Sequence, residues 1–520
     1  MSEKSLKFFL FLAVLINFYL TLGLTPLFNL DEGAFGEATR EMLINHDFIT
    51  TYLNGALRFD KPILIYWLQA LSVNVFGLNE FAFRLPSALA ATAWAFGIYW
   101  FAKRFYDKKS AIFAAFFMIT ALQIGLIAKA AIADSLLNMF IAFSMFSLFL
   151  YIKSQEKKLL YMTFAFIAGG FLTKGPVAVL VPLATFFIYS IIKKDIKFFF
   201  KTIFNPIGIV IFALIALPWY IAEYMAQGDK FIEGFFLKHN LSRFETSFEK
   251  HKGSILYYIP VVLIGLLPWT SLFIKYLLNL KNWLKKHDDF ILFGSIWFFF
   301  VFIFFSLSGT KLPHYVIYGY TPLFIFMALS FKEIKSEFLL SFPFILFLIV
   351  LIILPFFLQK NLPLFKDYYT KTAIITLLPL FNKIYFAVML SLLILSVIKF
   401  TKEIKAIILG FSMIIVLNYM GWIYAHVRAI PVKEAAFYVK KHNIKNIVMY
   451  RLNTPSFNIY SQRLVEKKSP KPGDIVITKI TSLKKFNYEL LYKGGVVALV
   501  KIKPVSSHSL PFNYKKDRRE

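Results

Sequence analysis

The sequence of 520 residues contains no cysteine, and only 17% of its residues are charged. The absence of cysteine excludes a disulfide framework, iron–sulfur clusters, thiolate zinc sites and cysteine nucleophiles. Soluble domains carry about 25% charged and about 45–50% apolar residues, whereas this chain is 58% hydrophobic and 19% aromatic. The composition therefore predicts an α-helical polytopic membrane protein.

Acidic residues are also scarce, since 29 Asp and Glu stand against 58 Lys and Arg and give a formal net charge of +29. In a soluble protein such a charge indicates nucleic acid binding. In a membrane protein it has an ordinary cause, because short cytoplasmic loops collect Lys and Arg. The chain also lacks the glycine-rich P-loop and Rossmann motifs that bind nucleotides. We therefore expect membrane lipids as partners and no nucleic acid.

About 20 apolar residues are needed to cross the hydrocarbon core, and thirteen stretches are candidate spans. They begin near Phe8, Leu85, Ser110, Ser135, Leu159, Val177, Ile203, Ile255, Phe290, Tyr315, Phe338, Ile384 and Ala406. The first stretch follows two lysines as a signal peptide would, but it lacks a small-residue cleavage site, so we expect a retained helix. Thirteen crossings would place the two chain ends on opposite sides of the membrane.

The connectors between these spans differ in charge on the two sides. One side receives short basic connectors, at residues 103–109, 153–158, 193–197, 285–286, 332–335 and 399–405. The positive-inside rule makes this side cytoplasmic. The other side receives two long loops, at about residues 26–84 and 222–254, and the tail from residue 426.

The tail has the pattern of a soluble domain. A helix is expected over residues 432–441 and strands over 446–450, 474–478 and 494–502, with Pro and Gly between them. The sequence therefore predicts a membrane domain at residues 1–425 and a small α/β domain at residues 426–520 on the outer side.

The outer loops and helix ends mix acidic and basic side chains, unlike the inner connectors. These side chains include Asp31, Glu32, Glu37, Arg40, Glu41, Arg58, Asp60, Lys61, Arg84, Asp134, Lys174, His239, Arg243, Lys311 and His314. Each motif alone has an ordinary structural explanation. Asp31 and Asp134 could be helix N-caps, and Lys174 could be a snorkelling lysine in a turn. Six such sites on one face of the bilayer nevertheless favour a functional site.

The chemistry of this set indicates a substrate class. Arg and Lys form charge-assisted hydrogen bonds to phosphate oxygens. Carboxylates act on sugars as general bases or by stabilising an oxocarbenium-like centre. Since the external face has no nucleotide pool, a lipid-linked donor is the reasonable one. We therefore expect transfer of a glycosyl group from a polyprenyl-phosphate carrier.

The motifs that carry these residues follow one another over about the first 330 residues. They are Leu30-Asp31-Glu32-Gly33, Asp60-Lys61-Pro62, Arg84-Leu85-Pro86, Ala133-Asp134-Ser135, Leu172-Thr173-Lys174-Gly175-Pro176, Pro218-Trp219-Tyr220, His239-Asn240 with Arg243-Phe244, and Lys311-Leu312-Pro313-His314-Tyr315. In order and spacing they resemble the aminoarabinose lipid A transferases, bacterial relatives of the dolichyl-phosphate-mannose protein mannosyltransferases. Beyond residue 330 only the span count and the external tail agree.

This resemblance implies the GT-C glycosyltransferase fold, with about 13 transmembrane helices, and a role for each matching residue. Asp31, with Glu32 beside it, matches the essential first-loop aspartate, and Asp134 the second carboxylate of the cavity. The residues matching those around the carrier phosphate are Lys61, Lys174, Arg243 and Tyr315. Further substrate contacts are expected at Arg58, Arg84, Lys311 and His314.

The resemblance implies no required cofactor, but it leaves a divalent metal such as zinc open. Some relatives hold a metal between an acidic residue and a histidine that match Asp60 and His239. Here an aspartate stands where a glutamate is usual, and two ligands are fewer than the three or four of typical zinc sites. Phe35 also stands where the family tends to have a tyrosine, so the donor sugar is less defined than the reaction class.

The expected protein is thus an integral membrane glycosyltransferase of the bacterial inner membrane, multi-pass and monomeric, with its active site at the periplasmic face. Its donor would be an undecaprenyl-phosphate sugar of the aminoarabinose type, and its acceptor a lipid A phosphate or another glycolipid. A protein O-mannosyltransferase and a polytopic transporter are the alternatives. Asp31 would be a general base if the acceptor is a hydroxyl, and an orienting group if it is a phosphate.

Overall fold

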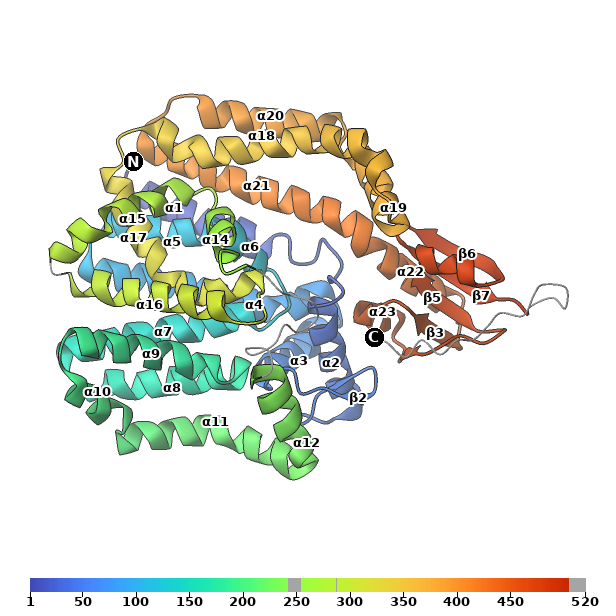
Figure 1. Ribbon diagram of the computed structural model, residues 1–520, viewed down its shortest axis with the longest axis horizontal. Helices are drawn as coiled ribbons and strands as arrows, with labels where there is room; N and C mark the ends of the chain where they lie inside the picture. Colours follow the sequence, from blue (N-terminus) through green and yellow to red (C-terminus); the bar gives the residue numbers. More distant parts are fainter. Residues whose placement is uncertain (242–253, 287, 505–520) are drawn as a thin grey trace.

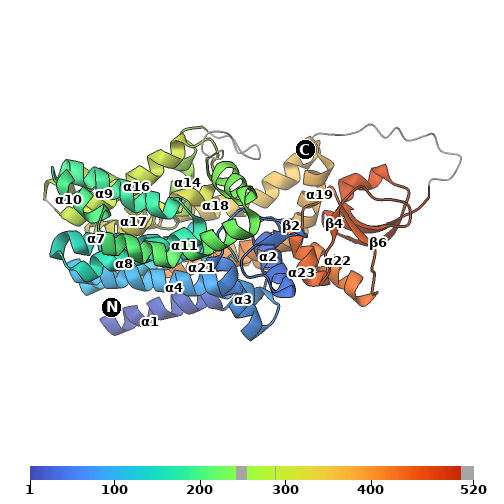
Figure 2. The ribbon, with the colours of Figure 1, turned by 90° about the horizontal axis from the view of Figure 1, so that it is seen from below.

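The computed structural model describes residues 1–241, 254–286 and 288–504, without the side chains of residues 238–241. A bundle of long helices forms most of the molecule, and a smaller domain with a β-sheet lies at one end of it (Figures 1 and 2). The α9–α10 turn, which contains the basic connector at residues 193–195, lies at the opposite end (Figure 1).

The bundle is built from long apolar helices, several of them bent. In chain order these are α1 (Glu3–Val14) continued by η1 (Leu15–Tyr19), α4 (Glu80–Phe105), α5 (Lys108–Thr120), α6 (Leu122–Ala128), α7 (Asp134–Ser154), α8 (Lys157–Lys174), α9 (Val177–Ile192), α10 (Ile196–Ile203), α11 (Pro206–Gln227), α14 (Tyr258–Gly265), α15 (Thr270–Lys285), α16 (Asp289–Leu307), η4 (Pro313–Gly319), α17 (Thr321–Glu333), α18 (Glu337–Asn361), η5 (Leu362–Leu364), α19 (Tyr368–Leu377), η6 (Leu378–Leu380), α20 (Lys383–Val397) and α21 (Lys402–Arg428).

Within the described residues, six helices are long and apolar enough to cross a membrane, and ten spans result if each of four bent helix pairs counts as one. All thirteen expected starts lie in a helix or within three residues of one. Two of these starts lie in α1 and α8, which are not long and apolar enough to count as membrane spans. Helix α9 is apolar but shorter. The polytopic character is confirmed, and the number thirteen stays a prediction.

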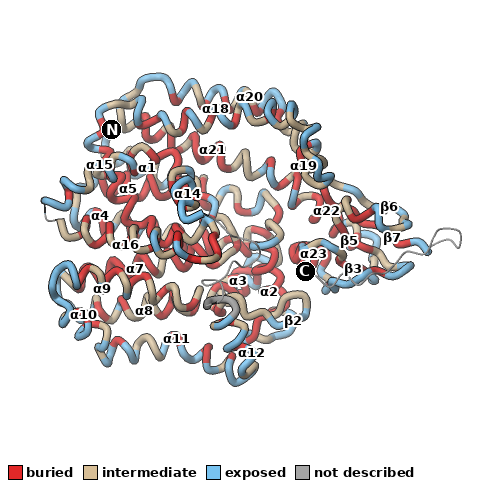
Figure 3. The backbone as a smooth tube through the Cα atoms, viewed as in Figure 1, coloured by how far each residue is buried: buried red, intermediate tan, exposed pale blue. Residues whose placement is uncertain are grey.

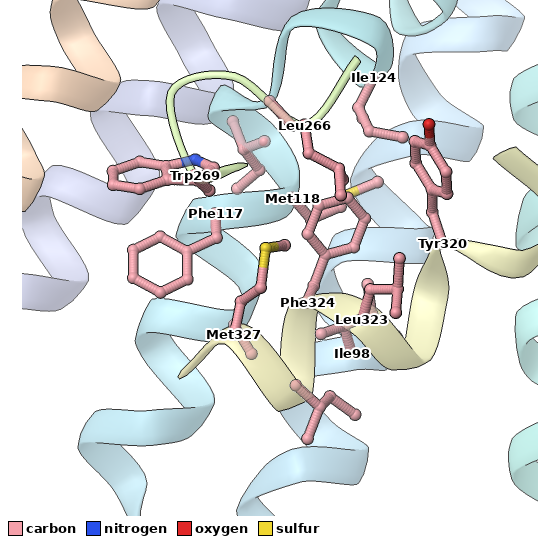
Figure 4. Packing of buried hydrophobic residues seen from close by; sticks show 14 of the residues in the cluster. Ile98, Phe117, Met118, Ile124, Leu266, Trp269, Tyr320, Leu323, Phe324 and Met327 are labelled. Carbon is pink, nitrogen blue, oxygen red and sulfur yellow. The ribbon is translucent and has the colours of Figure 1, made fainter. Parts of the chain in front are cut away.

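Burial follows the expected division between a packed interior and a lipid-facing surface. Buried residues line the inner faces of the bundle helices, whereas α11 and α18 are largely exposed (Figure 3). Figure 4 shows the interior, where Trp269, Phe117 and Met327 pack beside Met118 and Phe324. The indole Nε1 of the buried Trp269 donates to Thr120 Oγ1 at 3.0 Å, so its polar group is satisfied.

The first long loop is ordered by two short helices and a hairpin. Helix α2 (Glu32–Asn45) leads into strands β1 (Tyr52–Leu53) and β2 (Ala56–Leu57) and then into α3 (Leu64–Phe76). The turn of this antiparallel hairpin has Asn54 and Gly55 at positive φ, as a tight two-residue turn requires. Its amides are held by Glu41, which accepts from Asn54 N at 2.6 Å and from Gly55 N at 2.9 Å. The second long loop is described only in part, through α12 (Asp229–Phe231) and η2 (Ile232–Leu241).

The C-terminal domain follows α21, which ends at Arg428. It consists of α22 (Ile430–Lys441), α23 (Pro455–Ser461), η7 (Ile480–Lys485) and the strands β3 (Ile447–Tyr450), β4 (Glu466–Lys467), β5 (Ile475–Lys479), β6 (Tyr488–Gly494) and β7 (Val497–Ile502). The sheet order is β4-β3-β5-β7-β6, with β4, β3 and β5 parallel and β7 antiparallel to both neighbours. The expected helix and three strands are present, and the sheet supports the α/β fold predicted for the tail.

A buried ion pair joins the first loop to the bundle. Glu32 Oε1 and Oε2 accept from Arg84 Nε and Nη2, each at 2.7 Å, and both side chains are buried. Arg84 also donates to the backbone carbonyls of Leu22, Thr25 and Pro26, and Glu32 accepts from Phe28 N at 2.9 Å and Ala131 N at 2.8 Å. Each of the two carboxylate oxygens of Glu32 thus accepts from two donors. The pair therefore fixes α2, α4 and the segment before α7 relative to one another.

This ion pair generates a stability prediction. Arg84→Met should lower the free energy of unfolding by about 3–5 kcal/mol, because it leaves Glu32 buried without a counter-charge. The double variant Glu32→Gln/Arg84→Met should lose less than the sum of the two single variants. Thermal unfolding in detergent measures both. Lys468→Met, which breaks the exposed pair with Glu466, is the control and should leave the midpoint unchanged; strict additivity of the two buried substitutions would contradict the account.

Candidate active site

Asp134 is the buried centre of a charged cluster that includes Lys174 and His314. It is the first residue of α7, and its Oδ1 accepts from Lys174 Nζ at 2.7 Å and from the Tyr318 hydroxyl at 3.3 Å. His314 Nε2 lies 4.0 Å from the same oxygen. Lys174 closes α8, and His314 and Tyr318 lie in η4, so three separate elements meet at this carboxylate.

Lys174 also lies against aromatic rings. Its Nζ is 5.4 Å from the ring centroid of Tyr318 and 5.8 Å from that of Tyr315. A cation over a ring face gains electrostatic stabilisation. The Lys174 ammonium donates to Asp134 alone among the described residues, and since a lysine has three N–H donors, two stay available for a ligand.

Asp31 is an exposed carboxylate on which the charges of this cluster act. It occupies the N-cap position of α2, but its side chain makes no capping hydrogen bond. The pKa of Asp31 is raised above its ordinary value, because desolvation by the surrounding protein and the negative charge of Asp134 outweigh the attraction of Lys174. The charges of Asp134 and Lys174 therefore act on Asp31, and its side chain does not serve as the helix cap that was its ordinary structural explanation.

A second charged group lies around Asp60 in the same loop. Asp60 Oδ2 accepts from Arg58 Nη2 at 3.0 Å, and Oδ1 accepts from Lys61 Nζ at 2.9 Å. The Arg58 guanidinium lies 5.6 Å from the ring centroid of Phe35, which stacks on Tyr66. The ring of Phe35 thus serves as a platform for Arg58 at the position where the resembling family tends to have a tyrosine.

The remaining expected residues fall into different places. Lys311 is buried and donates to the carbonyl of Ser308 at 2.7 Å. Tyr315 packs with its ring centroid 5.0 Å from that of Phe305, beside Lys174. Glu32 and Arg84 are both buried in the ion pair described above. Arg243 and the side chain of His239 lie outside the described residues.

The expected metal ligands are Asp60 and His239, and this expectation stays a prediction because the side chain of His239 lies outside the described residues. No group of three or more His, Asp or Glu side chains in the described part of the chain is arranged to hold a metal ion. Both oxygens of Asp60 already accept from Arg58 or Lys61, and those cations would repel a metal ion.

Sequence reasoning missed two residues that the structure brings to the site. Tyr318 reaches Asp134 from one turn beyond Tyr315, and Tyr66 accepts from Arg58 Nε at 3.4 Å. Both are buried tyrosines in apolar segments. A buried tyrosine usually finds a hydrogen-bond partner for its hydroxyl. A tyrosine within an apolar segment was therefore the indication that the sequence offered.

Comparisons with known proteins agree with this fold and site. Residues 60–221 match the family model described as dolichyl-phosphate-mannose-protein mannosyltransferase. The chain is 28% identical to an uncharacterized protein of Aquifex aeolicus over 95% of this chain and 99% of that protein. It is 31% identical to the undecaprenyl phosphate-alpha-4-amino-4-deoxy-L-arabinose arabinosyl transferase of Aeromonas salmonicida, over 64% of this chain and 61% of that enzyme's length.

Among solved structures, the chain is similar to ArnT from Cupriavidus metallidurans bound to undecaprenyl phosphate. The TM-score is 0.79 at 17% sequence identity, and the match covers 96% of this chain and 98% of ArnT. The similarity therefore includes the C-terminal domain, where the sequence motifs give little guidance. The resemblance to the aminoarabinose lipid A transferases is confirmed, and the chain has the GT-C fold that this resemblance implies.

Proposed function

We propose that this protein is a membrane glycosyltransferase that moves a sugar of the aminoarabinose type from undecaprenyl phosphate to a lipid A phosphate. The observation that carries the proposal is the pair of carboxylates, Asp31 and Asp134, with the Lys174 ammonium, which forms an ion pair with Asp134 and attracts Asp31. These residues belong to a fold shared with ArnT. The arabinosyl transferase name of relatives at 31% identity supports the donor and the reaction class.

The charges of the site fit the breaking of a glycosyl-phosphate bond. As the anomeric bond breaks, negative charge grows on the carrier phosphate, and fixed cations stabilise it in the transition state. Two of the three N–H donors of Lys174 have no acceptor among the described residues and suit this purpose. Lys61 and Arg58, held against Asp60 in the same loop, and Arg243 complete the proposed phosphate-binding set.

The adjacent acids Asp31 and Glu32 have different proposed roles. Asp31 is exposed, accepts no capping hydrogen bond and lies next to the second carboxylate, so it is the group that touches substrate. Glu32 is buried and all its acceptor positions are used by Arg84, Phe28 and Ala131. We therefore assign Glu32 and Arg84 to positioning Asp31 rather than to contacting substrate.

The proposed location is the bacterial inner membrane, with the site at the periplasmic face. The basic connectors lie at the end of the bundle away from the site and the C-terminal domain, as the positive-inside rule requires for that orientation. We propose that the protein works as a monomer.

A protein O-mannosyltransferase is the second candidate, because the matching family model carries that description. The two functions differ in the acceptor, a phosphate in one case and a Ser or Thr hydroxyl in the other.

The acceptor can be determined with the purified protein in detergent. It is offered an undecaprenyl-phosphate aminoarabinose donor with either lipid A or a Ser/Thr-rich peptide, and the products are weighed by mass spectrometry. We expect modified lipid A and unmodified peptide. A glycosylated peptide with unmodified lipid A would replace the proposed acceptor by a protein.

Asp31→Asn keeps the shape of the side chain but removes its charge and basicity. Transfer to a hydroxyl should fall by about 10²–10⁴-fold, the usual contribution of a general base, while transfer to a phosphate should survive in part because that acceptor needs no deprotonation. Since the pKa of Asp31 is raised above 3.8, the ionised form is lost at a higher pH than for an ordinary aspartate.

The activity of the wild type should therefore decline toward acid through this raised pKa, and Asp31→Asn should lose that part of the pH profile. Asp195→Asn, at the N-cap of α10 at the other end of the bundle, is the matched control and should keep the wild-type profile. An unchanged rate and profile in Asp31→Asn would show that Asp31 has no part in the reaction.

A further inference from the structure

The short helix α23 of the C-terminal domain packs tightly on α2, the helix that begins beside Asp31. All residues of α23 are buried, and the two helices lie side by side in Figures 1 and 2. Two glycines of α2 permit the contact. A Cβ at Gly33 would lie 2.8 Å from the backbone nitrogen of Ser456, and one at Gly36 would lie 2.8 Å from Ile459 Cδ1.

Polar contacts from the same domain hold the chain on both sides of α2. Before the helix, the Tyr460 hydroxyl accepts from Leu27 N at 2.7 Å, and Ser456 Oγ donates to Asn29 Oδ1. After the helix, Asn458 Nδ2 donates to Asn54 Oδ1 in the hairpin turn at 2.8 Å. The loop that carries Asp31 is thus fastened to the C-terminal domain at three points.

Tyr460 connects this contact to the bundle as well. Its hydroxyl donates to Glu80 Oε1 at 3.0 Å, and Lys433 forms an ion pair with the same oxygen at 2.5 Å. Glu80 is the first residue of α4, one turn before Arg84. One tyrosine therefore joins the C-terminal domain, the start of the first loop and the helix that supplies the partner of Glu32.

We propose that the C-terminal domain is a positioning unit of the active site, in which α23, including its residue Tyr460, sets the position of Asp31 at the start of α2. Asp31 has no capping bond of its own, so its position depends on the Glu32–Arg84 pair and on the segments 27–30 and 33–36 on either side. Both of these segments contact α23, the first through hydrogen bonds to Tyr460 and Ser456 and the second through close packing of its glycines. Tyr460 and Ser456 act through Asp31 and do not touch substrate; the inference rests on the proposed role of Asp31.

Tyr460→Phe removes the hydroxyl and keeps the ring. Its matched control is Tyr492→Phe, which removes a tyrosine-to-glutamate hydrogen bond to Glu434 at 2.6 Å elsewhere in the same domain. We expect turnover in Tyr460→Phe to fall about 10- to 100-fold, since a small misplacement of a reacting group has effects of this size. The KM for the donor should stay within about twofold, and the acid limb of the pH profile should move because the surroundings of Asp31 change.

Gly33→Ala tests the packing contact separately from the hydrogen bonds. Gly421→Ala is its control, because that helical glycine of α21 has no atom within 4 Å of an added Cβ. We expect Gly33→Ala to lose turnover as Tyr460→Phe does, and Gly421→Ala to behave as the wild type. Turnover and pH profiles in Tyr460→Phe and Gly33→Ala that match those of their controls would overturn the proposal.

The docking itself has a readout that needs no catalysis. The chain contains no cysteine, so cysteines introduced at the exposed Ile44 on α2 and Leu490 on β6 accept two spin labels specifically. The distance distribution between them should be narrow in the wild type and broader or shifted in Gly33→Ala. Loss of turnover with an unchanged distribution would contradict positioning by docking. A wild type that docks but transfers no sugar would instead reject the proposed function.

Discussion

The buried ion pair between Glu32 and Arg84 is the contact on which the geometry of the site depends. Glu32 follows Asp31 directly, and the backbone amide of Ala131, which donates to Glu32 Oε1, lies three residues before Asp134. One carboxylate thus ties together the segments that carry Asp31 and Asp134. Breaking such a pair is costly, since either partner left alone is a buried charge, and this cost keeps the first loop from separating from the bundle.

Charge neutralisation is the second constraint on this end of the molecule. The cations near Asp31 are held by carboxylates, with Lys174 on Asp134, Lys61 and Arg58 on Asp60, and Arg40 on Glu37. Such pairing holds long flexible side chains in place before a substrate arrives, as preorganised electrostatic stabilisation requires. Asp31 differs because its side chain makes no capping hydrogen bond, and it is the member of this set that we propose to contact substrate.

Much of this arrangement could be predicted from the sequence because it depends on local patterns. Apolar runs placed the membrane helices, and the motifs around Asp31, Lys61, Asp134 and Lys174 carried the resemblance that the comparisons confirmed. The number of spans was harder to predict, because some spans are bent. Helices α14 and α15 lie at 119° to each other, and the hydropathy of the sequence does not reveal such a break.

The long-range contacts could not be predicted. Glu32 and Arg84 are 52 residues apart, and each alone has an ordinary explanation as a first-turn acid or an interfacial cation. The seven-residue α23 has no strong helical pattern, and nothing in the sequence relates Ser456 or Tyr460 to Asn29 and Leu27 more than 400 residues earlier. Such pairings depend on how the whole chain folds, so they appear only in three dimensions.

The most direct test of the central claim is mass spectrometry of lipid A and of secreted proteins from the host, with and without the gene for this chain. The account predicts that lipid A loses a mass equal to one sugar of the aminoarabinose type when the gene is removed, and that reintroducing the gene restores it. Unchanged lipid A together with loss of sugar from secreted proteins would contradict the account.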